Sequence, residues 1–176
     1  MNHFYPKFRE CLADQVAPAP RVFVDKGMAR GVDWSAVLGK ALLHSKIMVP
    51  LFTPPYFESK WCMAEWESMR ARERLLGLAT ADRPQGLVYP ILYSDSNNFP
   101  DAAKAISRWD FKKLAIPEPV FQKSRDYIRF HRKVTELAED LVELLKEVPE
   151  WQPDWPVIEP PDPPLLPPPT IPRFGP

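Results

Sequence analysis

The chain has 176 residues, and its 23 lysine and arginine residues balance its 23 aspartate and glutamate residues, so the formal net charge is zero. Proteins that bind nucleic acid through phosphate contacts usually have a basic face, and this balance argues against that class. No apolar run is long enough to span a bilayer, no secretory signal precedes the first helix, and the two cysteines make no disulfide framework, so the sequence predicts a cytoplasmic protein that binds no membrane.

The first half of the chain predicts alternating helices and strands. Apolar residues four apart in Asn2–Val16 predict an amphipathic helix that packs on a sheet. Arg21–Val24 predicts a short buried strand that ends at Asp25, before a loop with two glycines. A second helix is predicted from the apolar stripe in residues 37–42. Ile47–Phe52 is apolar and rich in β-branched residues, which predicts a central strand buried on both faces.

A helix follows this strand and carries an acidic and an aromatic side chain near its start. Two consecutive prolines end the strand, and Ser59 can cap a helix that runs from about Lys60 to Leu76. Trp61 and Glu65 are four residues apart, so they lie on one face of this helix. The sequence therefore predicts that both side chains lie on one rim, close to the end of the preceding strand.

The second half predicts two further strands and a long closing helix. Leu87–Tyr93 predicts a strand in which Pro90 implies an edge position or a bulge. Ile106–Phe111 predicts a last short strand, and the apolar spacing in Ser124–Val148 predicts a long amphipathic helix. This order predicts an α/β fold with a mostly parallel sheet and helices on both faces.

The composition changes at Pro149, where prolines become too dense for a helix or a strand. The sequence thus predicts a folded domain over residues 1–148 and an extended, proline-rich tail over residues 149–176, with few contacts to the domain after about Trp155. The tail is either a loose linker or a docking peptide for an aromatic groove of a partner, because it contains the P-x-x-P spacing.

The order of these motifs resembles that of Toll/interleukin-1 receptor (TIR) domains. The stretch S-x-W-C-x-x-E, which ends at Glu65, is similar to the start of that family's third helix. Upstream, Val22–Asp25, Gly31 and Leu38–Ser45 resemble its second strand, its BB loop and its second helix. The similarity covers roughly residues 4–145 and implies a flavodoxin-like, three-layer parallel sheet with helices on both faces.

The resemblance also implies that one strand of the family's sheet is missing. In TIR domains a first strand lies between the second and third strands, but here Met1 stands directly before the first helix. An N-terminally truncated sheet would leave unpaired backbone groups on two strands, each costing about 1–3 kcal/mol if buried. Either the two neighbouring strands close on each other, or an empty slot separates them.

Many TIR domains cleave NAD+ at the bond between nicotinamide and ribose, with a glutamate at the position of Glu65. The resemblance therefore implies a possible NAD+ nucleosidase (NAD+ glycohydrolase) in which Glu65 is catalytic, NAD+ is the substrate, and no metal or other cofactor is needed. A carboxylate can stabilise the positive charge that develops on the ribose. The residues implied to bind the substrate are Trp61, Phe23, Asp25, Arg30 and Gly31.

The alternative is a non-catalytic interaction module that transmits signals by contacts between TIR domains. In this case the loop with Lys26 and Arg30 supplies surface contacts, and the proline-rich tail recruits a partner. The missing strand favours the module, whereas the presence of Trp61 and Glu65 favours the enzyme. Both alternatives predict other TIR domains as partners and a role in defence or cell signalling.

Overall fold

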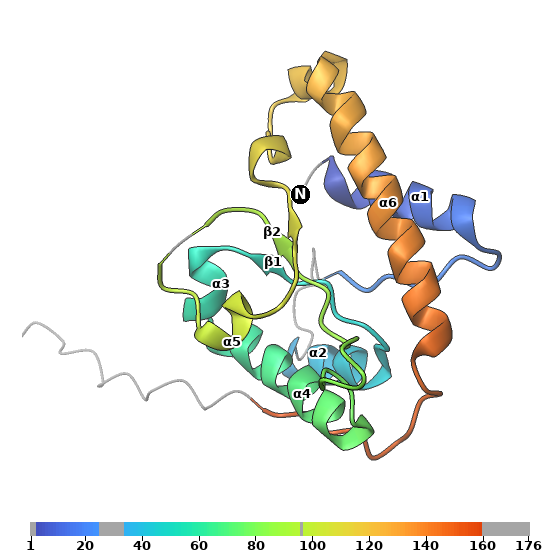
Figure 1. Cartoon of the computed structure of the whole chain (residues 1–176), viewed down its shortest axis with the longest axis vertical. Helices are drawn as coiled ribbons and strands as arrows, with labels where there is room; N and C mark the ends of the chain where they lie inside the picture. Colours follow the sequence, from blue (N-terminus) through green and yellow to red (C-terminus); the bar gives the residue numbers. More distant parts are fainter. Residues whose placement is uncertain (1–2, 25–33, 96, 160–176) are drawn as a thin grey trace, which may run out of the picture.

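The computed structural model describes residues 3–24, 34–95 and 97–159, and these residues contain a three-stranded parallel sheet (Figure 1). The strands are β1 (Leu51–Phe52), β2 (Ile91–Leu92) and β3 (Trp109–Asp110), in the order β1-β2-β3. The helices are α1 (Phe4–Gln15), α2 (Trp34–His44), α3 (Pro54–Glu58), α4 (Lys60–Leu76), α5 (Asp101–Lys104) and α6 (Arg125–Glu147), with 3-10 turns η1 (Lys112–Leu114) and η2 (Pro119–Lys123). The predicted parallel α/β architecture is confirmed.

Prolines shorten the regular strands without shifting their register. Tyr89 N–H donates to the carbonyl of Met48 (2.8 Å), and Ile91 N–H donates to the carbonyl of Pro50 (2.9 Å). Pairing between the two segments therefore starts upstream of β1, at a bridge between Met48 and Val88. Pro50 has no N–H to donate in return, which interrupts the ladder between this bridge and β1.

The edge position predicted from Pro90 is wrong, because β2 lies between β1 and β3. No bulge is present at this point either, since Met48 pairs with Val88 and Leu51 with Ile91 in the same register. Pro90 faces β3, and its carbonyl accepts a hydrogen bond from the first residue of that strand, Trp109 (3.0 Å). Its missing N–H faces the segment that precedes β3, so no bond of the β2–β3 ladder is lost.

The strand predicted at Arg21–Val24 is absent from the structure. Val22 packs partly against the core, but the segment forms no ladder. β1 is consequently an edge strand of the described sheet, rather than the central strand predicted from Ile47–Phe52. A β-branched sequence favours extended backbone, but a strand also requires a neighbour to pair with, and none of the described segments lies in that position. The implied N-terminal truncation stays a prediction.

One face of the sheet is covered by α6 and α1. The buried side of α6 includes Phe130, Val134, Leu137 and Leu141, as its apolar spacing predicts, whereas Ile128 from the same predicted stripe is 61% exposed. α1 packs mainly on α6, and the ring of Phe4 at its start lies 5.7 Å from that of Phe111, next to β3.

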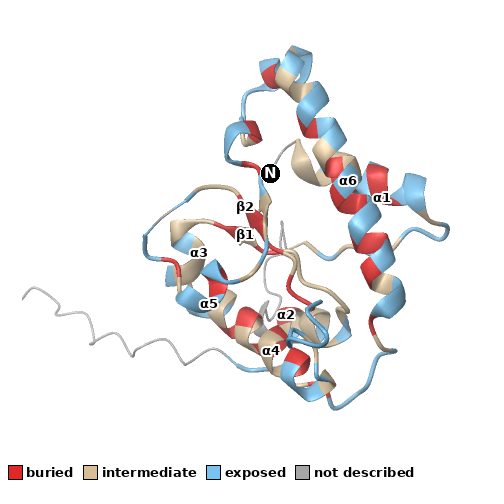
Figure 2. Ribbon diagram, viewed as in Figure 1, coloured by how far each residue is buried: buried red, intermediate tan, exposed pale blue. Residues whose placement is uncertain are grey.

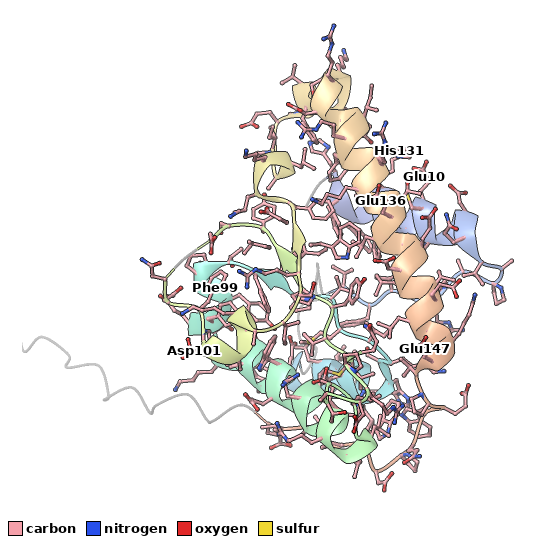
Figure 3. The ribbon with its side chains drawn as sticks, viewed as in Figure 1. Glu10, Phe99, Asp101, His131, Glu136 and Glu147 are labelled. Atoms are coloured by element: carbon pink, nitrogen blue, oxygen red, sulfur yellow. The ribbon has the colours of Figure 1, made fainter. Side chains whose placement is uncertain are left out.

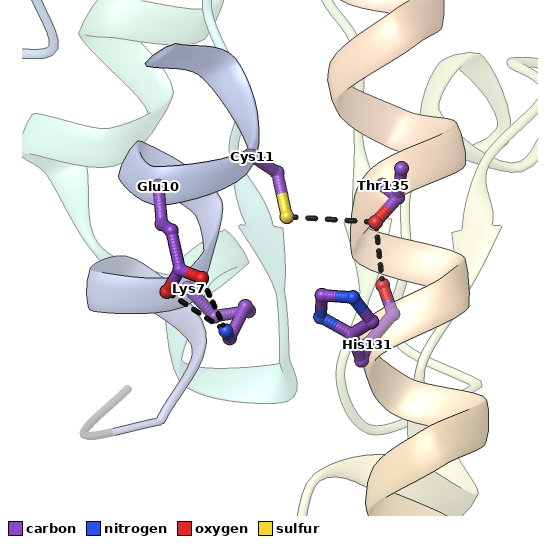
Figure 4. Close-up of polar contacts among 5 residues, drawn as sticks. All are labelled: Lys7, Glu10, Cys11, His131 and Thr135. Carbon is purple, nitrogen blue, oxygen red and sulfur yellow. Dashed lines mark hydrogen bonds and ion pairs between the residues drawn. The ribbon is translucent and has the colours of Figure 1, made fainter. Parts of the chain in front are cut away.

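The contact between α1 and α6 includes one polar interaction in its partly buried interior. The Cys11 thiol lies 3.5 Å from the hydroxyl of Thr135, which in turn donates to the carbonyl of His131 (Figure 4). Cys11 is buried and carries a free thiol, as does Cys62 on α4.

An aromatic cluster on the other face of the sheet anchors α3 and α4. Phe52 is fully buried, and its ring lies 4.8 Å from that of Phe57 and 5.5 Å from that of Trp66. Phe99, which precedes α5, packs on Phe57 at 4.7 Å (Figure 3). β2 and the inward sides of α4 and α6 are buried (Figure 2). The sequence of β1 therefore fixes the position of the two helices that follow it.

The chain continues beyond α6 along α2 and α4 (Figure 1). Residues 149–159 form no helix or strand, as predicted, and they contain a turn at residues 153–154, but Trp155 is only 3% exposed. The boundary predicted at residue 148 stays a prediction, because residues 160–176 lie outside the described part. Within the described ranges, no helix combines the length and apolar character that crossing a bilayer needs.

Replacing Ser59 by alanine is expected to lower the free energy of unfolding by about 1 kcal/mol. The Ser59 hydroxyl accepts a hydrogen bond from Cys62 N–H (3.3 Å) and so caps α4, as the sequence predicted. Urea denaturation of the parent and the variant measures this loss. Ser59→Asp retains an acceptor at the cap and should keep most of the stability, while an unchanged midpoint for Ser59→Ala would contradict the capping role.

Candidate functional site

Two helix caps place the predicted rim at the carboxyl end of β1. Thr53 caps α3 by accepting a hydrogen bond from Tyr56 N–H (3.3 Å), and Ser59 caps α4 directly afterwards. The chain therefore turns back immediately after β1, and α4 runs in the opposite direction to the strands. This places the first turns of α4 at the carboxyl edge of the sheet, where ligands bind in parallel α/β folds.

Trp61 and Glu65 lie one above the other on the first two turns of α4, as predicted. Trp61 is 39% exposed, and Glu65 is partly buried. The rim thus presents an aromatic surface and, one turn along the helix, an acidic group.

Tyr56 lies beside these residues and was not identified from the sequence as part of the site. Its phenol donates a hydrogen bond to the carbonyl of Cys62 (3.3 Å), in the first turn of α4. Burial raises the pKa of Tyr56 above its usual range, and Cys62 and Glu65 add to this effect. The phenol is therefore neutral at physiological pH. The only sequence signal for Tyr56 was its position three residues before Ser59, which caps α4.

The remaining predicted substrate-binding residues are only partly in the described structure. Phe23 belongs to the irregular segment before residue 25 and is 48% exposed. Asp25, Arg30 and Gly31 lie outside the described residues, and so does Lys26. The structure therefore brings together Trp61, Glu65 and Tyr56.

Two cavities lie away from this rim. One, of about 30 Å³, lies on the α1–α6 face between Phe4, Leu51 and Phe130, and it has room for about one water molecule. The other, of about 290 Å³, lies between residues 78–87 and the end of α6. Neither is lined by Trp61 or Glu65. The described residues also contain no cluster of three or more histidine, cysteine, aspartate or glutamate side chains that could bind a metal ion.

Tyr56→Phe is expected to make the folded state less sensitive to alkaline pH. Burial raises the pKa of Tyr56 in the folded chain, whereas an exposed tyrosine has a pKa of about 10. As the pH rises past this value, the unfolded chain ionises the phenol before the folded chain does, so the parent loses stability.

Phenylalanine cannot ionise, so the free energy of unfolding of the variant should rise relative to that of the parent above about pH 10. Urea denaturation at a series of pH values measures this difference. If the free energies of unfolding of the parent and the variant change in parallel with pH through the alkaline range, Tyr56 is not protected from ionisation.

The comparisons with known proteins give one match. A family model described as "TIR domain" matches residues 7–145 of the chain. No curated protein and no solved structure shows a significant match. The matched range begins in α1 and ends in α6, and it includes the whole sheet together with Trp61 and Glu65.

Proposed function

Because this chain belongs to the TIR domain family, we propose that it works in signal transduction through contacts with other TIR domains, and that it cleaves NAD+ with Glu65 as the catalytic carboxylate. Membership of the family supports signalling and protein–protein interaction in general. Cleavage of NAD+, a cytoplasmic location and a role in defence are the finer parts of the proposal.

The observation that carries the enzymatic part is the placement of Glu65 one helical turn from the exposed ring of Trp61, at the carboxyl edge of the sheet. Nicotinamide in NAD+ is already cationic, so it can leave without a general acid. The bond from ribose to nitrogen breaks with both electrons going to nicotinamide, and positive charge develops on the ribose. An ionised carboxylate next to the ribose stabilises this charge, as in glycosidases.

Trp61 and Tyr56 have separate roles in this proposal. The exposed face of Trp61 can stack on a flat ring of the ligand, which would place the ribose near Glu65. Tyr56 does not contribute a second negative charge, because its phenol is neutral and donates to the carbonyl of Cys62. Tyr56 therefore positions the first turn of α4 and leaves Glu65 as the acidic group of the rim.

Assembly is expected to be necessary for activity. We expect Trp61 and Glu65 to supply one wall of the substrate site, and a second TIR domain to supply the opposite wall. Release of nicotinamide should then rise more steeply than in proportion to protein concentration.

The experiment is a nicotinamide-release assay on the purified full chain, in dilute solution and tethered at high density. Release that appears only at high density supports the proposed enzyme. If the tethered parent protein releases no nicotinamide, the non-catalytic interaction module takes its place. That second candidate is favoured by the position of β1, which is an edge strand of the described sheet and so offers its outer side to a partner.

A further inference from the structure

Residues 149–159, which we call the strap, are bound to the chain's own surface by an aromatic and a basic side chain. Trp155 is buried, and the guanidinium of Arg72 lies 4.2 Å from the centre of its ring. Arg72 is itself fully buried and donates to the carbonyls of Ser45 (2.6 Å) and Leu42 (3.2 Å) at the end of α2. Arg72 therefore joins α2, α4 and the strap.

The strap has further anchors on the same two helices. The indole N–H of Trp151 donates to the carbonyl of Leu43 (3.2 Å), and its ring stacks on His44 with the ring centres 5.0 Å apart. Farther along, Ile158 N–H donates to the hydroxyl of Ser68 on α4 (2.8 Å). We call the surface formed by residues 42–45 of α2 and its end, together with Ser68 and Arg72 of α4, the α2–α4 groove.

The groove has the chemistry of a peptide-binding site. The last carbonyls of a helix have no N–H partner within the helix, so they can accept hydrogen bonds from other groups. Here they accept from Arg72 and from one tryptophan, while the guanidinium receives the face of the other tryptophan. The ligand that fits is therefore a segment of the form Trp-x-x-x-Trp-Pro, which the strap provides.

Docking of the strap leaves two buried donors without an acceptor among the described residues. They are Nε of Arg72 and Nε1 of Trp155. Each such group costs free energy, which offsets part of the gain from burying the tryptophan. Burial also lowers the pKa of Arg72 to about 10, because it removes a cation from water. The two unpaired donors thus reduce the net stabilisation of the docked strap.

We propose that the α2–α4 groove binds the strap of a second copy of the chain as well as its own, so that exchange of straps links neighbouring copies. The anchors described above all connect the strap to α2, α4 and the residues that follow α2, so the same contacts can form between two chains. Only residues 148–150 separate α6 from Trp151, which gives the chain's own strap a high effective concentration.

The chain's own strap therefore occupies the groove in dilute solution. When copies are held side by side, the strap of a neighbouring copy competes with it for the groove. This is the geometry of domain swapping, in which identical segments change places between protomers. Contacts between TIR domains would bring copies together in this way. The proposal is independent of NAD+ cleavage.

The test mixes two full-length variants that cannot dock their own straps. Trp151→Ala with Trp155→Ala removes the strap anchors but keeps the groove. Arg72→Leu with His44→Ala removes the groove but keeps the strap. Size-exclusion chromatography with light scattering should show a complex of twice the monomer mass in the mixture, and in neither variant alone. The free peptide of residues 149–159 should dissociate this complex.

Circular dichroism establishes that both variants are folded before they are mixed. If Arg72→Leu is unfolded, Arg72→Gln with His44→Ala replaces it, because glutamine can still donate to the carbonyls of α2 but has no guanidinium to hold the ring of Trp155. The proposal is overturned if two folded variants form no more complex together than separately. It is also overturned if the complex persists in excess peptide, or if the variant without strap anchors forms the same complex alone.

Discussion

Glu65→Gln should lower nicotinamide release by about 10²–10³-fold while the fold remains intact. Glutamine keeps the volume and polarity of the side chain but cannot offset the positive charge that develops on the ribose. The parent and the variant are compared by chromatography of released nicotinamide, under the tethered conditions in which the parent is active. Thermal denaturation of both proteins separates a catalytic loss from unfolding.

Glu67→Gln is the matched control, since it removes a carboxylate from the same helix on a different face. Its nicotinamide release should stay close to that of the parent. If Glu65→Gln retains full release, or if both variants lose it equally, Glu65 is not the catalytic carboxylate.

Glu73→Ala is expected to lower the free energy of unfolding by about 3–5 kcal/mol. This carboxylate is 2% exposed and lies near the other end of α4. One oxygen accepts from the N–H groups of Leu87 (2.6 Å) and Val88 (3.2 Å), and the other accepts from Arg70 (2.5 Å). Alanine would leave two buried N–H groups unpaired at the point where the β1–β2 pairing begins.

Urea denaturation measures this loss, and two further variants make it interpretable. Glu73→Gln keeps an acceptor for the backbone and should cost clearly less than Glu73→Ala. Glu136→Ala changes an exposed glutamate of α6 (Figure 3) and should stay within about 0.5 kcal/mol of the parent. A loss of less than about 1 kcal/mol for Glu73→Ala would show that water can replace this carboxylate.

The long helices could be predicted from the sequence because their signals are local. Ser59 and Ser124 cap α4 and α6 within one turn of the predicted starts, and the 3.6-residue period identifies the buried side of α6. The same period predicted that Trp61 and Glu65 share a face. Tyr56 escaped prediction because its neutral state depends on burial against residues that its sequence position does not specify.

The strands and the strap were harder to predict because they depend on distant partners. Arg21–Val24 has the composition of a strand but has no partner in the described structure. Pro50 and Pro90 have no N–H to donate. They are compatible with the sheet because Pro50 precedes β1, and because β3 begins at Trp109, which bonds to the carbonyl of Pro90. Composition predicted that residues 149–159 form no helix or strand, but it could not predict that Trp155 would lie on Arg72 of α4.

The bonds of Glu73 also determine how α4 can move. They fix one end of the helix to the segment that precedes β2, so a tilt of α4 about that end would move its first turns most. Trp61 lies 12 positions before Glu73, about 18 Å away along the helix axis, near the opposite end of α4. A tilt of about 5° would move it by about 1.6 Å, a displacement large enough to change a reaction rate a hundredfold. Arg72 and the strap lie next to this fixed end, where a small displacement of α4 becomes a larger one at the rim.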